Sequence, residues 1–338
     1  MKPDFAFYYP GQHWRDVGWI KNLICFFDGI ALLIPYDMPN PLRRDDDPVA
    51  WALEEHKLIR AIRPEEVIDE QAIETLAEAF GEIINSGRLD HLTKRDGKNI
   101  RKADFEALAK AKLGVHIDKK LANSIFQTLY SMGLACDLGD NVSIRMDRTV
   151  LALVLVLLAH ILKPKGEDMG ITLSPTTDQR KVINILGEIL KPESAPPAVG
   201  DIISFDIAKV GIDFGSVPIE EILDFRKQHY HQHRDYILSV RAFARELSLM
   251  PPDEREAKFE QRQEELKALS HDLRRVYRGS WEEAFSFGIG LAGAAWAANQ
   301  GNPVAGALAA LAAVPALISD KPKEVGVYSY LISAKQKF

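Results

Sequence analysis

The stretch Ile30-Ala31-Leu32-Leu33-Ile34-Pro35 decides the fold of this chain. The residues before the proline are apolar on both faces of an extended chain, which is typical of a strand buried inside a parallel sheet. One strand is predicted before it at Phe5 to Tyr9, and another after it at Leu58 to Ile62. Helices are predicted between these strands, one capped by Asp16 and one from Pro48 to His56. This order indicates a βαβαβ unit with right-handed crossovers.

The βαβαβ unit is assigned to residues 1–68, and residues 69–195 are predicted to form a helical region with a small β-hairpin. Helices are expected at residues 70–85, 102–113, 118–132, 149–162 and 178–190. Residues 134–138 and 142–146 are predicted as two strands joined by a Gly-Asp-Asn turn. A helix followed by such a hairpin resembles half of a winged helix. We expect a structural role for it, because no basic recognition helix is evident.

Residues 200–338 are predicted to hold a return strand, a long helical hairpin, an uncharged helical hairpin and a last strand. Residues 202–214 alternate apolar and polar side chains in part, so one or two strands are expected there, and Val325 to Ile332 is the last strand candidate. Both are expected to join the N-terminal sheet. The long helical hairpin begins at Pro218 and turns at Pro251-Pro252. The predicted fold class is mixed α/β and helix-rich, with a small, mostly parallel sheet.

Residues 284–319 contain no Asp, Glu, Lys or Arg. A turn at Gly301-Asn302-Pro303 divides them into two arms, each about as long as the ~17 residues of a short bilayer-spanning helix. We expect two antiparallel helices, either buried against the protein or in contact with a membrane. Small residues near helical spacing would let the two backbones approach closely. The residues predicted to make these contacts are Gly290, Gly293, Trp296, Gly306, Leu308 and Leu311.

The composition is that of an ordinary globular protein. The chain has 338 residues, of which 46% are hydrophobic and 27% charged, and its net charge is −6. This charge argues against a general nucleic-acid binder, although it allows a local basic patch. Cys25 and Cys136 lie far apart in apolar surroundings, which favours buried thiols in a reducing cytosol. No apolar signal core follows Met1, so we expect a cytoplasmic protein, with membrane association left open by the uncharged arms.

Short motifs are spread over most of the chain, and the uncharged stretch near the C-terminus accompanies them. They are Tyr8-Tyr9-Pro10, Trp19, the run at residues 30–35, Leu158-Ala159, residues 175–178 and residues 222–226. Together they resemble a bacterial family of unknown function. Such families often accompany mobile elements and anti-phage loci, so the resemblance implies a part in antiviral defence. It supplies no catalytic residues.

The first candidate site is the sequence from Arg226 to His233. Arg226 and His231 have Arg-x4-His spacing, and Arg226 and His233 have Arg-x6-His spacing. Helical ribonucleases of the HEPN type use such a pair, with histidine as acid or base and arginine to stabilise the charge of the transition state. The spacing therefore allows a HEPN-like ribonuclease, although a two-residue pattern is undemanding.

Two metal sites are also compatible with the sequence. His229 and His233 are four residues apart on one helical face, which is the spacing of a two-histidine metal pair. Acidic residues that include Asp45 and Asp47 follow the second strand, where α/β folds place their sites, and could hold Mg²⁺. The simpler interpretations are a polar break in a helical stripe and a solvated loop with a helix cap at Asp47. We expect no cofactor, because no Gly-rich phosphate loop occurs.

These patterns lead us to expect a non-enzymatic interaction module, part of a bacterial anti-phage assembly. Its uncharged hairpin would contact a partner protein or a membrane. The alternatives are the HEPN-like ribonuclease and a metal-dependent enzyme at the loop after the second strand. Nucleic acid is not expected as a partner, on the ground of the net charge.

Overall fold

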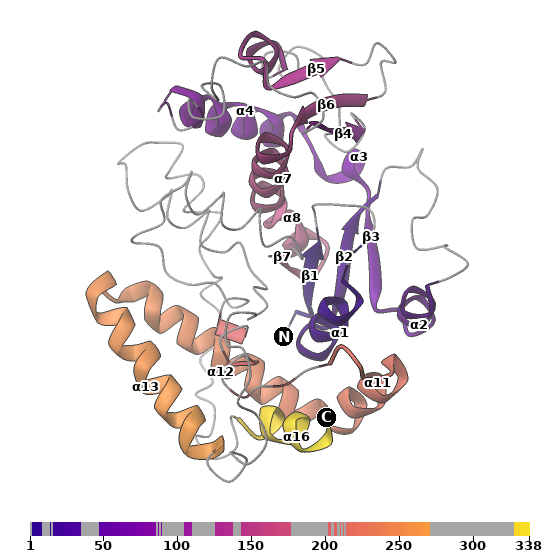
Figure 1. The fold of residues 1–338 in the computed structure, drawn as a ribbon, viewed down its shortest axis with the longest axis vertical. Coiled ribbons are helices and arrows are strands. Elements are labelled where there is room, and N and C mark those ends of the chain that lie inside the picture. The colour runs from indigo at the N-terminus through magenta and orange to yellow at the C-terminus, as the bar shows by residue number, and fades with distance from the viewer. Residues whose placement is uncertain are drawn as a thin grey trace.

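In the computed structural model a four-stranded parallel sheet lies between the helices from the middle of the chain and the C-terminal helices (Figure 1). The structure describes residues 2–8, 14, 16–34, 47–85, 87, 89, 105–109, 126–137, 143–176, 202, 203, 206, 207, 210, 212, 214–270 and 328–338. Its longer helices are α1 (Val17–Phe26), α2 (Pro48–Glu55), α4 (Glu70–Asn85), α7 (Arg148–Leu162), α11 (Ile219–Gln228), α12 (Tyr230–Leu249), α13 (Pro252–Ser270) and α16 (Ser329–Lys337). Two short helices are α3 (Pro64–Val67) and α8 (Lys165–Asp168). The predicted mixed α/β class is confirmed.

The parallel sheet has the strand order β3-β2-β1-β7. Its strands are β1 (Asp4–Tyr8), β2 (Gly29–Leu33), β3 (Ile59–Ile62) and β7 (Thr172–Thr176). Helices α1 and α2 connect the first three strands, and all neighbouring strands are parallel, so the predicted βαβαβ unit is confirmed. Strand β7 pairs with the other side of β1, where Tyr8 lies opposite Thr176.

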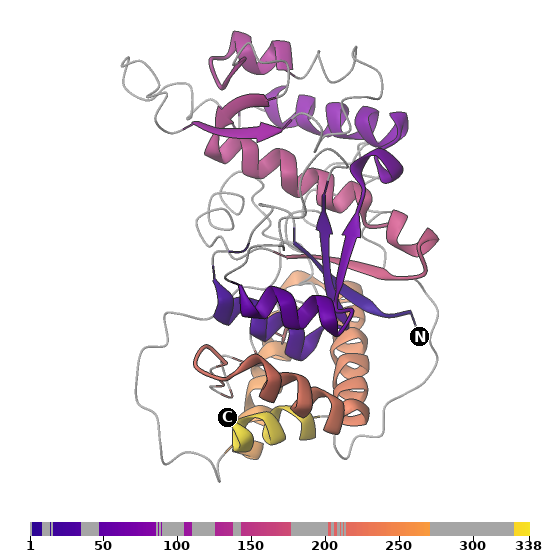
Figure 2. The same cartoon turned by 90° about the vertical axis from the view of Figure 1, so that its right-hand side faces the viewer.

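The side chains of the parallel strands alternate between two cores, one on each face of the sheet. Phe7, Ala31 and Leu33 belong to the core that includes residues of α4 and α7. Tyr8 and Leu32 belong to the other core, which includes residues of α1, α2, α11, α12 and α16. In Figure 2 the helices from the middle of the chain lie above the sheet and the C-terminal helices lie below it. Both faces of β2 are buried, as its continuous apolar sequence requires.

Two aspartates start the helices of the βαβαβ unit. Asp16 accepts a hydrogen bond from the backbone N–H of Trp19 at 2.9 Å, at the N-terminus of α1. Asp47 accepts bonds from Val49 and Ala50 at 3.1 and 3.0 Å, and Pro48 occupies the first position of α2. These side chains satisfy backbone donors that the first turn of a helix leaves without partners. Both caps were predicted from the sequence.

Gly29, the first residue of β2, lies where a side chain does not fit. A Cβ atom there would lie 2.5 Å from Phe5 Cε1 and 2.6 Å from the Leu58 carbonyl oxygen. We expect Gly29→Ala to lower the free energy of unfolding by about 1–3 kcal/mol, because the backbone at Leu58 would have to move. Urea denaturation measures this loss.

The matched control is Gly81→Ala in α4, where a Cβ would meet nothing within 4 Å. A helix favours alanine over glycine by up to about 1 kcal/mol, so this variant should be as stable as the wild type or more stable. An equal loss of stability in both variants would contradict the steric argument at Gly29.

A second sheet is antiparallel and has the strand order β4-β6-β5. Its strands are β4 (Phe105–Ala109), β5 (Ala135–Asp137) and β6 (Ser143–Asp147). The hairpin of β5 and β6 was predicted and is confirmed. Strand β4 lies inside the helix predicted at residues 102–113, so that prediction is wrong. The stretch is rich in alanine, which favours a helix locally, but pairing with β6 determines its conformation.

Two other predicted strands are helical. Among residues 202–214, the described positions 202, 203, 206, 207 and 210 are helical. The predicted last strand at residues 325–332 overlaps α16, which begins at Ser329. The strand that does extend the parallel sheet is β7, which contains Pro175. Proline cannot donate to a neighbouring strand, and β7 lies at the edge of the sheet, where only one side needs pairing.

The long helix predicted from Pro218 is interrupted. His229 adopts a non-helical backbone conformation, which separates α11 from α12. Helix α13 follows after Pro251 and packs on α12, with the rings of Phe243 and Phe259 at 5.6 Å and Lys258 Nζ 2.7 Å from Glu246 Oε1. The predicted helix at residues 178–190 and the uncharged hairpin at residues 284–319 lie outside the described residues.

Candidate functional site

His233, one of the predicted catalytic residues, is buried in the first turn of α12. Its Nε2 donates a hydrogen bond to the carbonyl oxygen of Phe26 at 3.0 Å. This carbonyl belongs to the last turn of α1, where helix carbonyls have no partner inside the helix. The imidazole ring also lies 5.1 Å from the ring of Tyr330. His233 therefore joins α12 to α1 and α16.

The surroundings of His233 keep its ring neutral. Burial, together with the nearby Arg226 guanidinium, lowers the pKa of His233 to about 4. The hydrogen bond to Phe26 and the charge of Asp28 oppose this shift. At neutral pH Nε2 carries a proton that the Phe26 carbonyl accepts. A general base for RNA cleavage needs a pKa closer to the working pH and contact with its substrate, and His233 has neither property.

Charged groups continue from Arg226 along the amino ends of β1 and β2. Arg226 Nη2 lies 3.7 Å from Asp28 Oδ1, and Asp28 accepts a hydrogen bond from the backbone N–H of Asp4 at 2.7 Å. Asp4 pairs with Arg241 at 2.8 Å and accepts a bond from the Ser174 hydroxyl at 2.9 Å. Burial raises the pKa of Asp4, and Arg241 opposes that effect. Because α/β folds bind ligands at the carboxyl ends of their strands, we interpret this cluster as a joint between elements.

Tyr330 of α16 extends the joint to the C-terminus. Its hydroxyl donates to the carbonyl oxygen of Cys25 at 2.6 Å and lies 3.1 Å from the Cys25 sulfur. Burial raises the pKa of the Cys25 thiol to about 12. Because the thiolate is the reactive form of cysteine, Cys25 is inert at neutral pH. It is the buried thiol that the sequence predicted.

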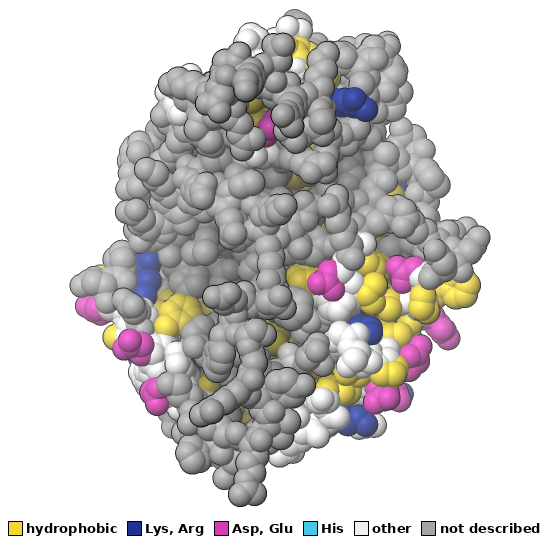
Figure 3. Space-filling model, viewed as in Figure 1, with side chains coloured by type: hydrophobic (Ala, Val, Ile, Leu, Met, Phe, Trp, Pro, Cys, Tyr) yellow, Lys and Arg dark blue, Asp and Glu magenta, His cyan; other side chains and the backbone are white. Residues whose placement is uncertain are grey.

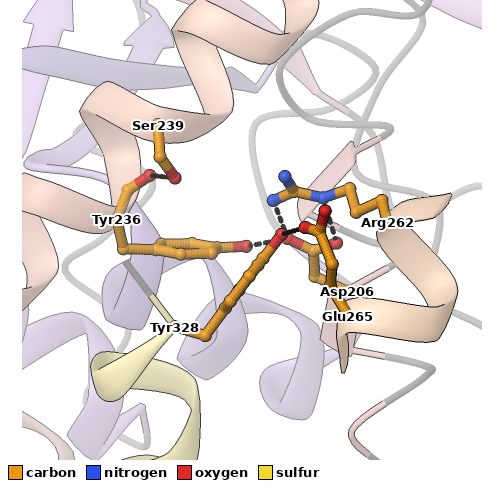
Figure 4. Close-up of polar contacts among 6 residues, drawn as sticks. All are labelled: Asp206, Tyr236, Ser239, Arg262, Glu265 and Tyr328. Atoms are coloured by element: carbon orange, nitrogen blue, oxygen red, sulfur yellow. Dashed lines mark hydrogen bonds and ion pairs between the residues drawn. The ribbon is translucent and has the colours of Figure 1, made fainter. Parts of the chain in front are cut away.

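A second buried cluster is centred on the ion pair of Asp206 and Arg262 (Figure 4). Arg262 Nε and Nη2 donate to the two carboxylate oxygens of Asp206 at 2.8 and 2.5 Å. Tyr236 donates its hydroxyl to the same carboxylate at 2.8 Å. The rings of Phe243 and Tyr328 lie 4.7 and 5.2 Å from the guanidinium carbon. These contacts connect the segment around Asp206 to α12, α13 and the start of α16.

Burial and ion pairing determine which side chains of this second cluster carry a charge. Burial raises the pKa of Asp206 and also that of Tyr236. Burial would lower the pKa of Arg262, but its hydrogen bonds to Asp206 raise it overall. Arginine keeps its proton in proteins, so the carboxylate stays ionised opposite it. The two charges of the cluster, on Asp206 and Arg262, are bonded to each other inside the protein, so the cluster is suited to hold helices together.

The side chains of the other two predicted histidines have partners different from those of His233. The ring of His229 lies against that of Phe225 in a tilted arrangement, with centroids 4.4 Å apart, and its Nδ1 is hydrogen-bonded to Gln232. His231 is exposed on α12. Of the predicted catalytic residues, Arg226 lies close enough to His233 for its charge to lower the pKa of that ring. His231 belongs to neither buried cluster.

The predicted metal ligands that the structure describes all make other contacts. The rings of His229 and His233 contact Gln232 and Phe26, and Asp47 caps α2. Asp45 lies outside the described residues. Within the residues that the structure describes, no group of three or more His, Cys, Asp or Glu side chains is arranged to hold a metal ion.

Sequence reasoning missed the ion pair of Asp4 and Arg241 in the first cluster and that of Asp206 and Arg262 in the second. One signal was present: Phe259, Arg262 and Leu266 are spaced as one helical stripe, so an arginine interrupts an apolar face of α13. Asp206 lies among apolar residues that had been assigned to a strand. Asp4 gave no signal, because its partner Arg241 is more than two hundred residues away in the sequence.

The six residues predicted for partner contact, from Gly290 to Leu311, lie outside the described residues. Within the described part of the chain, no helix combines the length and the apolar character that a membrane crossing requires. Comparisons with protein-family models, with curated proteins and with solved structures found no match.

Proposed function

We propose that this chain is a non-enzymatic interaction module that contacts a partner protein. The observation that carries the proposal is the use made of its buried polar side chains. Arg226, His233 and Asp206 have the chemistry of catalytic residues, but each is bonded between helices or between a helix and the sheet. Groups committed in this way stabilise a scaffold, whereas a catalytic group must reach a substrate.

The partner contact is assigned to residues 284–319. A stretch of this length without charge is poorly solvated, so it gains free energy when protein or lipid covers it. We favour protein, because each arm is short for a bilayer span and is rich in weakly hydrophobic alanine and glycine. The support for a place of the module in a bacterial anti-phage assembly is the family resemblance of its sequence motifs.

The test is binding of a partner through the uncharged arms. The tagged full chain is purified from its own host, the retained protein is identified, and the purified pair is titrated. We expect Leu308→Asp with Leu311→Asp to weaken that affinity at least tenfold, about the loss at a central apolar contact. The matched control is Leu249→Asp, which changes an apolar residue that is already 80% exposed.

Three outcomes would overturn the proposal. An equal loss of affinity in the Leu249→Asp control would remove the role of the arms. Flotation of the chain with vesicles of phosphatidylethanolamine and phosphatidylglycerol would favour the membrane instead. Cleavage of RNA by the wild type, abolished by Arg226→Ala and by His231→Ala, would establish the HEPN-like ribonuclease.

A further inference from the structure

Trp51 on α2 is a large apolar side chain that stays on the surface, with 54% of it exposed. The opposite side of the same helix is buried, because Val49, Ala50 and Leu53 belong to the core that includes α1 and α11. An aromatic side chain gains free energy when its area of about 150–250 Å² leaves water, so a tryptophan is usually buried over most of its surface. Trp51 is therefore not required by the core and remains free to contact a partner.

The exposed sides of three helices join around Trp51. Helix α11 packs against both α1 and α2, and in Figure 3 hydrophobic side chains gather over α2 and α11 with acidic ones among them. Besides Trp51, the apolar residues that reach this surface are Val17 at the start of α1, Pro48 on α2, Pro218 and the half-buried Leu223 on α11. We call this surface the α2–α11 face.

The charged side chains of the α2–α11 face are mostly acidic. Its exposed carboxylates are Asp16, Glu54, Glu55, Glu220, Glu221 and Asp224, and its exposed cations are Lys57, Lys227 and Lys337. Lys337 contributes from α16, where its Nζ lies 3.9 Å from Glu221. The other cation of α11, Arg226, points to Asp28 in the joint. Six carboxylates and three ammonium groups leave a net charge of −3 on this face, which is half of the −6 of the whole chain.

This charge decides which occupant suits the apolar surface. In a symmetric contact, a second copy of the chain would place an equal negative charge against the first. Anionic lipids and nucleic acid also carry the same sign as the face. A helix with Lys or Arg beside its apolar stripe is complementary in both respects, because its apolar side chains cover Trp51 and its cations meet the carboxylates.

We infer that the α2–α11 face binds a basic amphipathic helix of a partner protein, with Trp51 as the central apolar contact. Tryptophan is among the residues that contribute most to binding at protein interfaces. The inference goes beyond the proposed function, because different residues carry it. Residues 284–319 contain no Lys or Arg, so they do not supply the positive charge that this face requires.

The test is fluorescence anisotropy of a labelled amphipathic helical peptide of leucine and lysine, titrated with the full chain at low and at physiological salt. We expect a Kd on the order of 10 µM at low salt, as suits a contact of modest area. Trp51→Ala should weaken binding at least tenfold. Glu220→Lys with Asp224→Lys should also weaken it about tenfold and make it less dependent on salt, because fewer charges are left to screen.

Two control variants match these changes elsewhere on the surface. Leu249→Ala shortens an apolar side chain that is 80% exposed on α12. Glu74→Lys with Glu78→Lys makes the same charge change on exposed positions of α4, which packs on the other face of the sheet. Both variants should bind the peptide within twofold of the wild type.

Four outcomes would overturn the inference. They are unchanged affinity after Trp51→Ala, an equal loss in the α4 variant, equal binding of a leucine and glutamate peptide, and a dimer of the chain that Trp51→Ala dissociates. The α4 variant distinguishes a local site from attraction by the net charge of the whole chain. The dimer would identify a second copy as the occupant of the face.

The same peptide separates this inference from the proposed function. Leu308→Asp with Leu311→Asp should leave the affinity for the peptide unchanged. A chain that binds the peptide but no partner through residues 284–319 would keep the inference and remove the proposed function. A chain that binds its partner through those residues but does not bind the peptide would do the opposite.

Discussion

Asp206→Ala is expected to lower the free energy of unfolding by about 3–5 kcal/mol, the range for removing one partner of a buried ion pair. Without the carboxylate, the buried guanidinium of Arg262 loses both of its hydrogen bonds to Asp206, and the Tyr236 hydroxyl loses its acceptor. The cost arises mainly from the unpaired buried charge, which water can no longer solvate. Urea denaturation of the full chain, followed by circular dichroism, measures the loss.

Two control variants test whether the loss of stability arises from the unpaired buried charge. Asp206→Leu combined with Arg262→Met removes both charges and should recover much of the lost stability, because apolar replacements of a buried pair are often neutral. Glu221→Ala breaks the exposed pair of Glu221 and Lys337, which lie 3.9 Å apart, and should cost less than about 1 kcal/mol. A loss below that value for Asp206→Ala would show that the cluster does not hold the helices together.

The second large effect is a dependence of stability on pH caused by His233. Its pKa is about 4 in the folded chain and 6.5 as the reference for an unfolded one. Below pH 6.5 the unfolded chain binds a proton that the folded chain does not, so the stabilisation from a neutral His233 is complete above pH 6.5 and is lost as pH falls toward 4. The total loss is about 3–4 kcal/mol, from roughly 1.4 kcal/mol for each pKa unit.

The measurement is urea denaturation at several pH values between 4 and 7. His233→Gln removes the titrating group, so the difference between wild type and variant isolates its contribution from other groups such as Asp4, whose raised pKa acts in the opposite direction. His231→Gln changes an exposed histidine and should leave the wild-type profile unchanged. Parallel profiles for wild type and His233→Gln would contradict the neutral, buried state of His233.

The βαβαβ unit was predictable because its signals are local. A fully apolar run such as Ile30–Ile34 fits a buried strand, and Asp16 and Asp47 cap the helices beside it. Strand β4 was not predictable in this way, since its pairing with β6 outweighs its local preference for a helix. Strand β7 was hidden by Pro175, which a strand accepts only at an edge position that the sequence does not reveal.

The helix around residue 206 could have been found from the sequence. Ile203, Ile207, Val210 and Phe214 recur at steps of three and four, which is helical spacing. The polar clusters could not have been found, because each joins residues that are distant along the chain. The spacing of Arg226 and His233 gave their proximity but not their burial or their bonds to Asp28 and Phe26.

The joint between Cys25 and Tyr330 has a consequence for synthesis, because these residues are 305 positions apart. Ribosomes add about 5–20 residues per second, so roughly 15–60 s pass between the appearance of α1 and that of α16. During this interval the core that contains Trp19, Leu23 and Leu32 lacks the residues that the C-terminal helices contribute to it in the finished protein. A nascent chain with such an incomplete apolar core is prone to aggregation until its C-terminal helices have been made.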